Sequence, residues 1–136
     1  MKVSTKGTYA LRIMTTIALN EDQNLLNVSA LSSMTNISDK YLEKIISKLL
    51  KAGLLVSFRG VSGGYKLAKE PSEITVNEIL NATEGNIKSV GCMNGENCDL
   101  FDKCLTVNIW AGLNKVVSDY LKSISLDDII NKRVNH

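Results

Sequence analysis

The sequence predicts a mainly α-helical fold with a small β-hairpin wing, that is, a winged helix-turn-helix followed by a long C-terminal helix. Three observations lead to this fold class. Two short segments with helix-capping signals follow each other closely, and the second carries lysines on one face. A glycine-rich hairpin pattern comes directly after them. Near the end of the chain, roughly twenty residues show the periodicity of an amphipathic helix.

The first two predicted helices are separated by a polar loop. Apolar residues at intervals of three and four predict a helix over about residues 6–20 with one buried face: Ala10, Ile13, Met14, Ile17 and Ala18. Leu26 and Leu31 flank Asn27 in the positions of a hydrophobic staple around an N-cap. A second, short helix is therefore expected over about residues 28–34.

The third predicted helix begins after the N-cap Ser38 and ends at Gly53, a residue suited to the position after a helix. At about 100° per residue its apolar residues fall on one side: Leu42, Ile45, Ile46, Leu49 and Leu50. Its lysines fall on the other side: Lys40, Lys44, Lys48 and Lys51. This pair of helices is typical of a helix-turn-helix, whose second helix enters the DNA major groove. Any three-helix core with a solvated face is the alternative.

Two strands are predicted over residues 54–58 and 65–68, where apolar and polar residues alternate. Between them lies Arg59-Gly60-Val61-Ser62-Gly63-Gly64, a glycine-rich turn with an arginine at its root. A hairpin directly after a helix-turn-helix indicates a winged helix. Arg59 is then placed to reach phosphate or the minor groove.

Three more helices are predicted in the rest of the chain. A capping box of Thr75 and Glu78 opens one over about residues 76–83, and Ser125 caps a short last one. Between them a long amphipathic helix carries an apolar seam: Leu105, Ile109, Leu113, Val116, Val117, Tyr120, Leu121 and Ile124, with Trp110 beside them. The seam exceeds what a small winged-helix core needs, so we expect a partner subunit to cover it. Packing against the first helix is the alternative.

Cys92, Cys98 and Cys104 are spaced six residues apart in a polar, glycine-rich stretch that predicts a loop. They lack the apolar neighbours of a buried thiol, and three thiols cannot all pair as disulfides. We interpret them as metal ligands. A structural zinc site is less favoured, because zinc prefers closely spaced pairs and four protein ligands. A small electron-transfer iron–sulfur protein would leave the winged-helix pattern unexplained.

Composition and charge narrow the function classes. The 136 residues, 44% of them hydrophobic, suffice for one ordinary domain. Residues 1–70 hold ten Lys and Arg against five Asp and Glu, whereas residues 71–136 hold six against nine. This asymmetry indicates a polyanionic partner for the first half, and a merely solvated basic face is the alternative. No apolar run approaches the roughly 18 residues of a membrane span and no signal peptide is recognised, so we expect a cytoplasmic protein without a membrane partner. The sequence shows no catalytic dyad, P-loop or dinucleotide motif, and enzyme activity is not expected.

Four segments resemble the winged-helix repressor family that contains the iron–sulfur cluster regulator IscR and the nitric-oxide sensor NsrR: residues 4–11, Tyr41-Leu42-Glu43, residues 59–65, and the three cysteines through Thr106. The resemblance covers essentially the whole chain. It implies a homodimeric repressor that binds double-stranded operator DNA, with Cys92, Cys98 and Cys104 ligating an iron–sulfur cluster in each subunit. A two-iron two-sulfur cluster is favoured over a four-iron four-sulfur cluster. The resemblance also implies that Glu43 contributes to base discrimination.

One position departs from the IscR pattern, because the histidine expected three residues after Cys104 is Val107. The aspartate that NsrR-like relatives supply from their first helix corresponds to Thr8, and the only histidine of the chain is His136. The fourth ligand is therefore unknown, with four oxygen donors nearby: Glu96, Asp99, Asp102 and Asn108. A cluster-independent winged-helix regulator of cysteine or sulfur metabolism is the alternative function.

The predicted organisation has three parts. Residues 1–83 form the DNA-binding winged helix, residues 84–104 a cysteine-bearing sensor loop, and residues 105–136 the dimerisation helix and a C-terminal helix. The candidate DNA-binding residues gather on the third helix and the wing: Ser38, Lys40, Tyr41, Glu43, Lys44, Arg59, Ser62 and Gly63.

Overall fold

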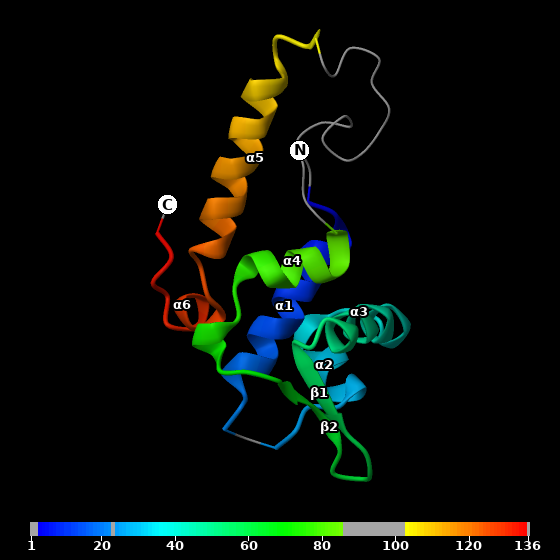
Figure 1. Ribbon diagram of the computed structural model, residues 1–136. Coiled ribbons are helices and arrows are strands. Elements are labelled where there is room, and N and C mark those ends of the chain that lie inside the picture. Colours follow the sequence, from blue (N-terminus) through cyan, green and yellow to red (C-terminus); the bar gives the residue numbers. More distant parts are fainter. Residues whose placement is uncertain (1–2, 23, 86–102, 136) are drawn as a thin grey trace.

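Helices make up most of the structure, and a two-stranded hairpin projects from them (Figure 1). The computed structural model describes residues 3–22, 24–85 and 103–135. Within these ranges the elements are, in chain order, α1 (Thr5–Leu19), α2 (Val28–Thr35), α3 (Asp39–Lys51), β1 (Leu55–Phe58), β2 (Gly64–Leu67), a 3-10 turn η1 (Pro71–Glu73), α4 (Val76–Glu84), α5 (Val107–Lys122) and α6 (Leu126–Ile130). The mainly α fold with a hairpin wing is the one that the sequence predicts.

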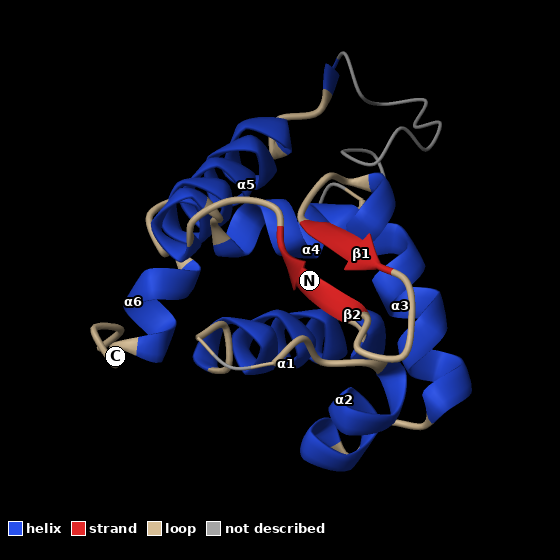
Figure 2. Ribbon diagram, turned by 90° about the horizontal axis from the view of Figure 1, so that it is seen from below, coloured by secondary structure: helices blue, strands red, loops and turns tan. Residues whose placement is uncertain are grey.

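Helix α1 runs through the middle of the core and contacts α2, α3, α4 and α6 (Figure 2). Among the side chains that fill this core are those that the helical periodicity predicted, namely Ile13 and Met14 of α1 and Leu42, Ile45, Ile46 and Leu49 of α3. Ile79 of α4 is buried with them. Burying each of them stabilises the fold by about 1.5–3 kcal/mol relative to leaving it exposed. Because α3 buries its apolar face here, its lysine-bearing face is left towards solvent.

The predicted N-caps are confirmed. The Asn27 side chain accepts a hydrogen bond from the Ala30 backbone N–H at 2.8 Å, and Ser38 accepts from the Tyr41 N–H at 3.4 Å. Between the two helices the chain turns at Asn36, whose φ of 60° lies in the left-handed region that asparagine tolerates. These local bonds satisfy N–H groups that have no partner within a helix, and they fix where α2 ends and α3 begins.

The wing is an antiparallel hairpin in which Leu55 pairs with Leu67 and Phe58 with Gly64. Tyr65 of β2 also pairs with Leu26, which ties the hairpin to the loop before α2. This approach requires a glycine at position 64, because a Cβ there would lie 2.6 Å from the Leu26 carbonyl oxygen. The hairpin is therefore anchored at a fixed place beside the helix-turn-helix.

The last helix returns to the core through a backbone pairing that the sequence did not reveal. Leu126 N–H donates to the Ile74 carbonyl and Val76 N–H donates to the Ile124 carbonyl, each at 2.9 Å. Leu126 is fully buried in the core cluster. The chain that follows α5 is thus attached to the helical core beside the start of α4.

Helix α5 extends away from the other helices (Figure 1). None of its residues is fully buried, and its inner side contacts α4. Four large side chains at helical spacing are 37–66% exposed: Ile109, Leu113, Val116 and Tyr120. We call these four residues the α5 apolar face. None of the helices in the described ranges has the length and apolar content needed to cross a bilayer.

Candidate nucleic-acid interface

Helix α3 presents its polar face to solvent beside the wing. Lys40, Glu43, Lys44 and Ser47 are exposed, and they follow the spacing of one helical stripe. Ser38 caps the start of the helix and is also exposed. A helix of about 10–12 Å diameter fits the major groove of B-DNA, which is about 12 Å wide. The exposed stripe of α3 is therefore available to base edges.

A groove of about 610 Å³ separates α3 from the wing. Glu43 and Asp39 of α3 line it on one side, and Arg59 and Gly63 of the wing line it on the other. Asn27 and Ser29, at the start of α2, also line it. A carboxylate that can accept from a cytosine amino group and an arginine that can bind phosphate thus line the same groove.

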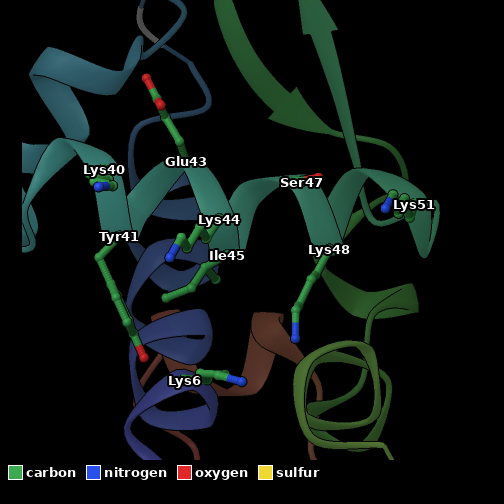
Figure 3. Close-up of a pocket in the computed structure, with 9 residues that line it drawn as sticks. All are labelled: Lys6, Lys40, Tyr41, Glu43, Lys44, Ile45, Ser47, Lys48 and Lys51. Carbon is green, nitrogen blue, oxygen red and sulfur yellow. The ribbon is translucent and has the colours of Figure 1, made fainter.

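A second cleft, of about 590 Å³, lies on the opposite edge of α3, against the start of α1 (Figure 3). Its lining includes Lys6 of α1 together with Lys40, Tyr41, Lys44 and Lys48 of α3. In Figure 3 Tyr41 and Lys48 extend on the side of α3 where Lys6 lies, whereas Glu43 points to the other side. We call this space the lysine cleft. Its positive charge suits an anionic ligand.

A chain of ring and cation contacts braces the three helices around this interface. The Tyr9 and Tyr41 rings meet edge to face, with centroids 5.6 Å apart. The Arg12 guanidinium lies 5.1 Å from the Tyr9 ring centroid and donates to the Thr35 carbonyl at 3.2 Å. Arg12 thereby links α1 to the last turn of α2, where the helix dipole favours a cation. The bracing fixes α3 relative to α1 and α2.

The structure brings the predicted DNA-binding residues together in two groups. Glu43, Arg59 and Gly63 share the groove beside the wing, and Ser62 lines an adjoining hollow with Asn27. Lys40, Tyr41 and Lys44 line the lysine cleft, where Tyr41 is half-buried against Tyr9. Sequence reasoning did not include Lys6, Asn27 or Ser29 in the site. Asn27 gave a capping signal only, and nothing in the local pattern of Lys6 connects it with α3.

Among the predicted cysteine ligands, Cys104 is described and is partly exposed just before α5, while Cys92 and Cys98 lie outside the described residues. The Cys104 Sγ lies 3.1 Å from the Thr106 hydroxyl oxygen. Hydrogen bonds from that hydroxyl and from the backbone N–H groups of Thr106 and Val107 lower the pKa of the Cys104 thiol. This favours the thiolate, the form that binds metals. The described ranges alone assemble no group of three His, Cys, Asp or Glu side chains able to hold a metal ion.

Comparison with known proteins identifies the family. The Rrf2 family, described as "Iron-dependent Transcriptional regulator", matches residues 3–132. The chain belongs to the Rrf2 family. A relative within it, the HTH-type transcriptional regulator IscR of Pectobacterium atrosepticum, is 35% identical over 133 residues, covering 98% of this chain and 81% of that protein.

Solved structures of Rrf2-like regulators share the fold. CymR, the global cysteine regulator of B. subtilis, superposes with a TM-score of 0.82 at 32% identity, covering 97% of this chain and 98% of that one. IscR of T. potens gives a TM-score of 0.79 at 32% identity, covering 98% of this chain and 89% of that one. The chain is therefore a winged-helix, DNA-binding transcriptional regulator of the Rrf2 family and not an enzyme.

Mutations should distinguish an α3 side chain that contacts phosphate from one that contacts a base edge. Lys44→Ala is expected to weaken binding to every DNA sequence and to lower the slope of log K against log salt by about 0.9, because a phosphate contact carries no base information. Glu43→Ala should leave that slope unchanged and relax preference at one base pair by about 1–3 kcal/mol. Fluorescence anisotropy titrations at several salt concentrations measure both. If both variants alter thermal stability alone, α3 is not the recognition helix.

Proposed function

We propose that this Rrf2 regulator is a homodimeric repressor that reads operator DNA through α3 and the wing, and that an iron–sulfur cluster bound by Cys92, Cys98 and Cys104 controls it. The observation that carries the DNA-reading part is the groove lined by Glu43 of α3 on one side and by Arg59 of the wing on the other. One side chain there can select a base while the other holds a phosphate. We expect the protein to act in the cytoplasm.

Two exposed features support a dimer. The α5 apolar face is uncovered in the described part of the chain, and a patch of large apolar side chains at helical spacing is suited to a second copy of the same helix. Each subunit also presents one α3, so two subunits would read two half-sites of an operator. The operator would then have the same two-fold symmetry as the protein dimer.

The donor chemistry supports a cluster. Cys92, Cys98 and Cys104 are the only cysteines of the chain, and thiolates are the usual ligands of iron–sulfur clusters. The hydrogen bonds that favour the Cys104 thiolate suit a ligand rather than a buried structural thiol. When bound, the cluster would supply a centre that responds to iron supply, redox state or nitric oxide. Cys104 would hold it next to the start of α5, so a change of ligation would act at the proposed dimer helix.

A cluster-independent regulator of cysteine or sulfur metabolism is the second candidate. The similarity to CymR, the global cysteine regulator of B. subtilis, favours it. Val107 favours it too, since an aliphatic side chain occupies the position where the IscR pattern has a histidine ligand. Under this alternative the winged helix would still bind DNA, and the three thiols would have another role.

Anaerobic purification tests the two candidates directly. We expect visible charge-transfer absorbance together with bound iron and acid-labile sulfide, and footprints on the protein's own promoter that differ between holo and apo protein. A colourless protein with no iron but an unchanged footprint would favour the cluster-independent regulator. A colourless, zinc-loaded protein would instead point to a structural zinc site. Visible absorbance without any footprint would instead favour an electron-transfer iron–sulfur protein.

A further inference from the structure

We propose that the lysine cleft is a second phosphate-binding edge of the DNA interface, formed by Lys6, Lys44 and Lys48, and that Glu84 is a positioning residue that holds Lys6 in place. The proposal rests on the proposed function, because it assumes that α3 enters the major groove. It adds one helix, α1, to the DNA-contacting surface.

The geometry of the major groove calls for contacts on both edges of a recognition helix. The groove is bounded by two sugar–phosphate strands, and a helix lying between them faces one strand with each edge. The edge of α3 beside the wing meets Arg59 across one groove. The opposite edge meets Lys6 across the lysine cleft (Figure 3). Arg59 and Lys6 therefore lie on opposite sides of α3, where the two strands would run.

The charges differ between the two edges. Glu43 and Asp39 line the groove beside the wing, whereas five lysines line the cleft: Lys6, Lys40, Lys44, Lys48 and Lys51. The Glu43 side chain borders both spaces, but it points away from Lys6 and Lys48 (Figure 3). Lysines converging from two different helices give a site for the phosphates of a DNA strand, which bind compact cationic groups without regard to base.

Lys6 occupies a place that helix electrostatics alone would not favour. It lies in the first turn of α1, where the dipole disfavours a cation, and no acidic residue lies in that turn. The N-cap Ser4 makes no capping bond with its own side chain. The negative charge comes instead from Glu84, at the end of α4. Its carboxylate accepts from the Ser4 backbone N–H and from the Gly7 N–H, each at 3.0 Å, and also from the Ser4 hydroxyl.

Glu84 therefore holds the backbone on both sides of Lys6. The contact depends on Gly7, because a Cβ at that position would lie 2.7 Å from the Glu84 Oε1 and 2.8 Å from the Val3 Cγ1. A larger residue would push the carboxylate away from the first turn. Without Glu84 the first turn of α1 would lose two of its backbone bonds, and Lys6 would be released from the edge of the cleft.

Salt-dependent binding to a short mixed-sequence DNA duplex tests the cleft. Lys6→Ala and Lys48→Ala are each expected to reduce the slope of log K against log salt by about 0.9 per bound subunit, because each removes one phosphate contact. Lys122→Ala, on exposed α5, is the matched control and should leave the slope unchanged. If both variants keep the wild-type slope, the lysine cleft does not bind DNA phosphate and the proposal is wrong. Absence of any salt-dependent binding by the wild type would overturn the proposed function instead.

A double-mutant cycle tests Glu84. Glu84→Ala should reduce the slope as much as Lys6→Ala does, and the double variant should show no further reduction, because both act through one contact. Glu84→Gln keeps a carbonyl acceptor and should retain the wild-type slope. If Glu84→Ala does not fold by circular dichroism, Glu84→Asp replaces it, since its carboxylate is one methylene shorter. Additive slope losses, or an unchanged slope in folded Glu84→Ala or Glu84→Asp, would overturn the positioning role.

Discussion

A chain carrying both Leu113→Glu and Val116→Glu is expected to be a monomer and to bind a two-half-site operator roughly 100-fold more weakly than the wild type. Both residues belong to the α5 apolar face and are 37% and 66% exposed in the single chain. At about 100° per residue the four members of this face fall within about 60° of each other, so they form one continuous strip. Glutamates in that strip would bury two charges in each subunit of a dimer, which is strongly unfavourable.

The loss of affinity follows from the loss of the second half-site. In a dimer the second α3 binds at a high effective concentration once the first is bound, and a monomer lacks this gain. Light scattering measures the mass, and operator binding is measured on the same samples. Ala111→Glu is the matched control, since it adds a carboxylate at an exposed α5 position about 160° from Ile109. Dimer mass retained by the double variant would place the subunit interface elsewhere.

Cys104→Ala is expected to abolish stable cluster binding and leave the fold intact. The side chain is partly exposed and lies outside the hydrophobic core, so its loss should change the melting temperature little. Thiolates are the soft ligands that iron–sulfur clusters need, and the chain has only two others, Cys92 and Cys98. Iron and sulfide content with the visible spectrum measures the cluster, and circular dichroism measures the fold. A cluster of wild-type stoichiometry in Cys104→Ala would exclude this thiol as a ligand.

Val107→His should have the opposite effect and slow the loss of the cluster in air. Val107 is the first residue of α5 and is partly exposed, three residues beyond Cys104. A histidine there would restore the nitrogen donor of the IscR pattern and should also change the visible spectrum. Lys115→His, at an exposed position about two turns further along α5, is the control for an added imidazole. An unchanged lifetime and spectrum in Val107→His would mean that another residue already completes the site. Substitutions at Glu96, Asp99 and Asp102 would then follow.

Most of the fold could be predicted from the sequence because its signals are local. The caps Asn27, Ser38 and Thr75 each satisfy an N–H group a few residues away, and the structure contains all three bonds. The wing follows from alternation around a glycine-rich turn, and its pairing joins neighbouring segments. The candidate residues Glu43 and Arg59 come from these same short segments, so the sequence also indicated one edge of the candidate interface.

What the sequence left open depends on contacts between distant residues. The apolar seam of the long helix was one set of side chains in the sequence, but the structure separates it into two sides. Val117 and Leu121 lie half-buried, whereas Val116 and Tyr120 remain exposed as part of the α5 apolar face. Periodicity finds apolar positions, but it cannot tell which of them the chain itself covers. Which apolar residues of α5 are covered depends on the direction in which α5 extends from the helical core.

The lysine cleft likewise exists only in the tertiary structure. Lys6 and Lys48 are more than forty positions apart in the sequence, and the packing of α1 against α3 brings them to one cleft. Glu84 reaches the first turn of α1 across an even longer separation. A charged residue carries no periodic signal of its own, because its partner is set by which helices pack together. The sequence by itself determined most of the elements and indicated the candidate recognition helix, and packing of the buried faces decided which surface charges became neighbours.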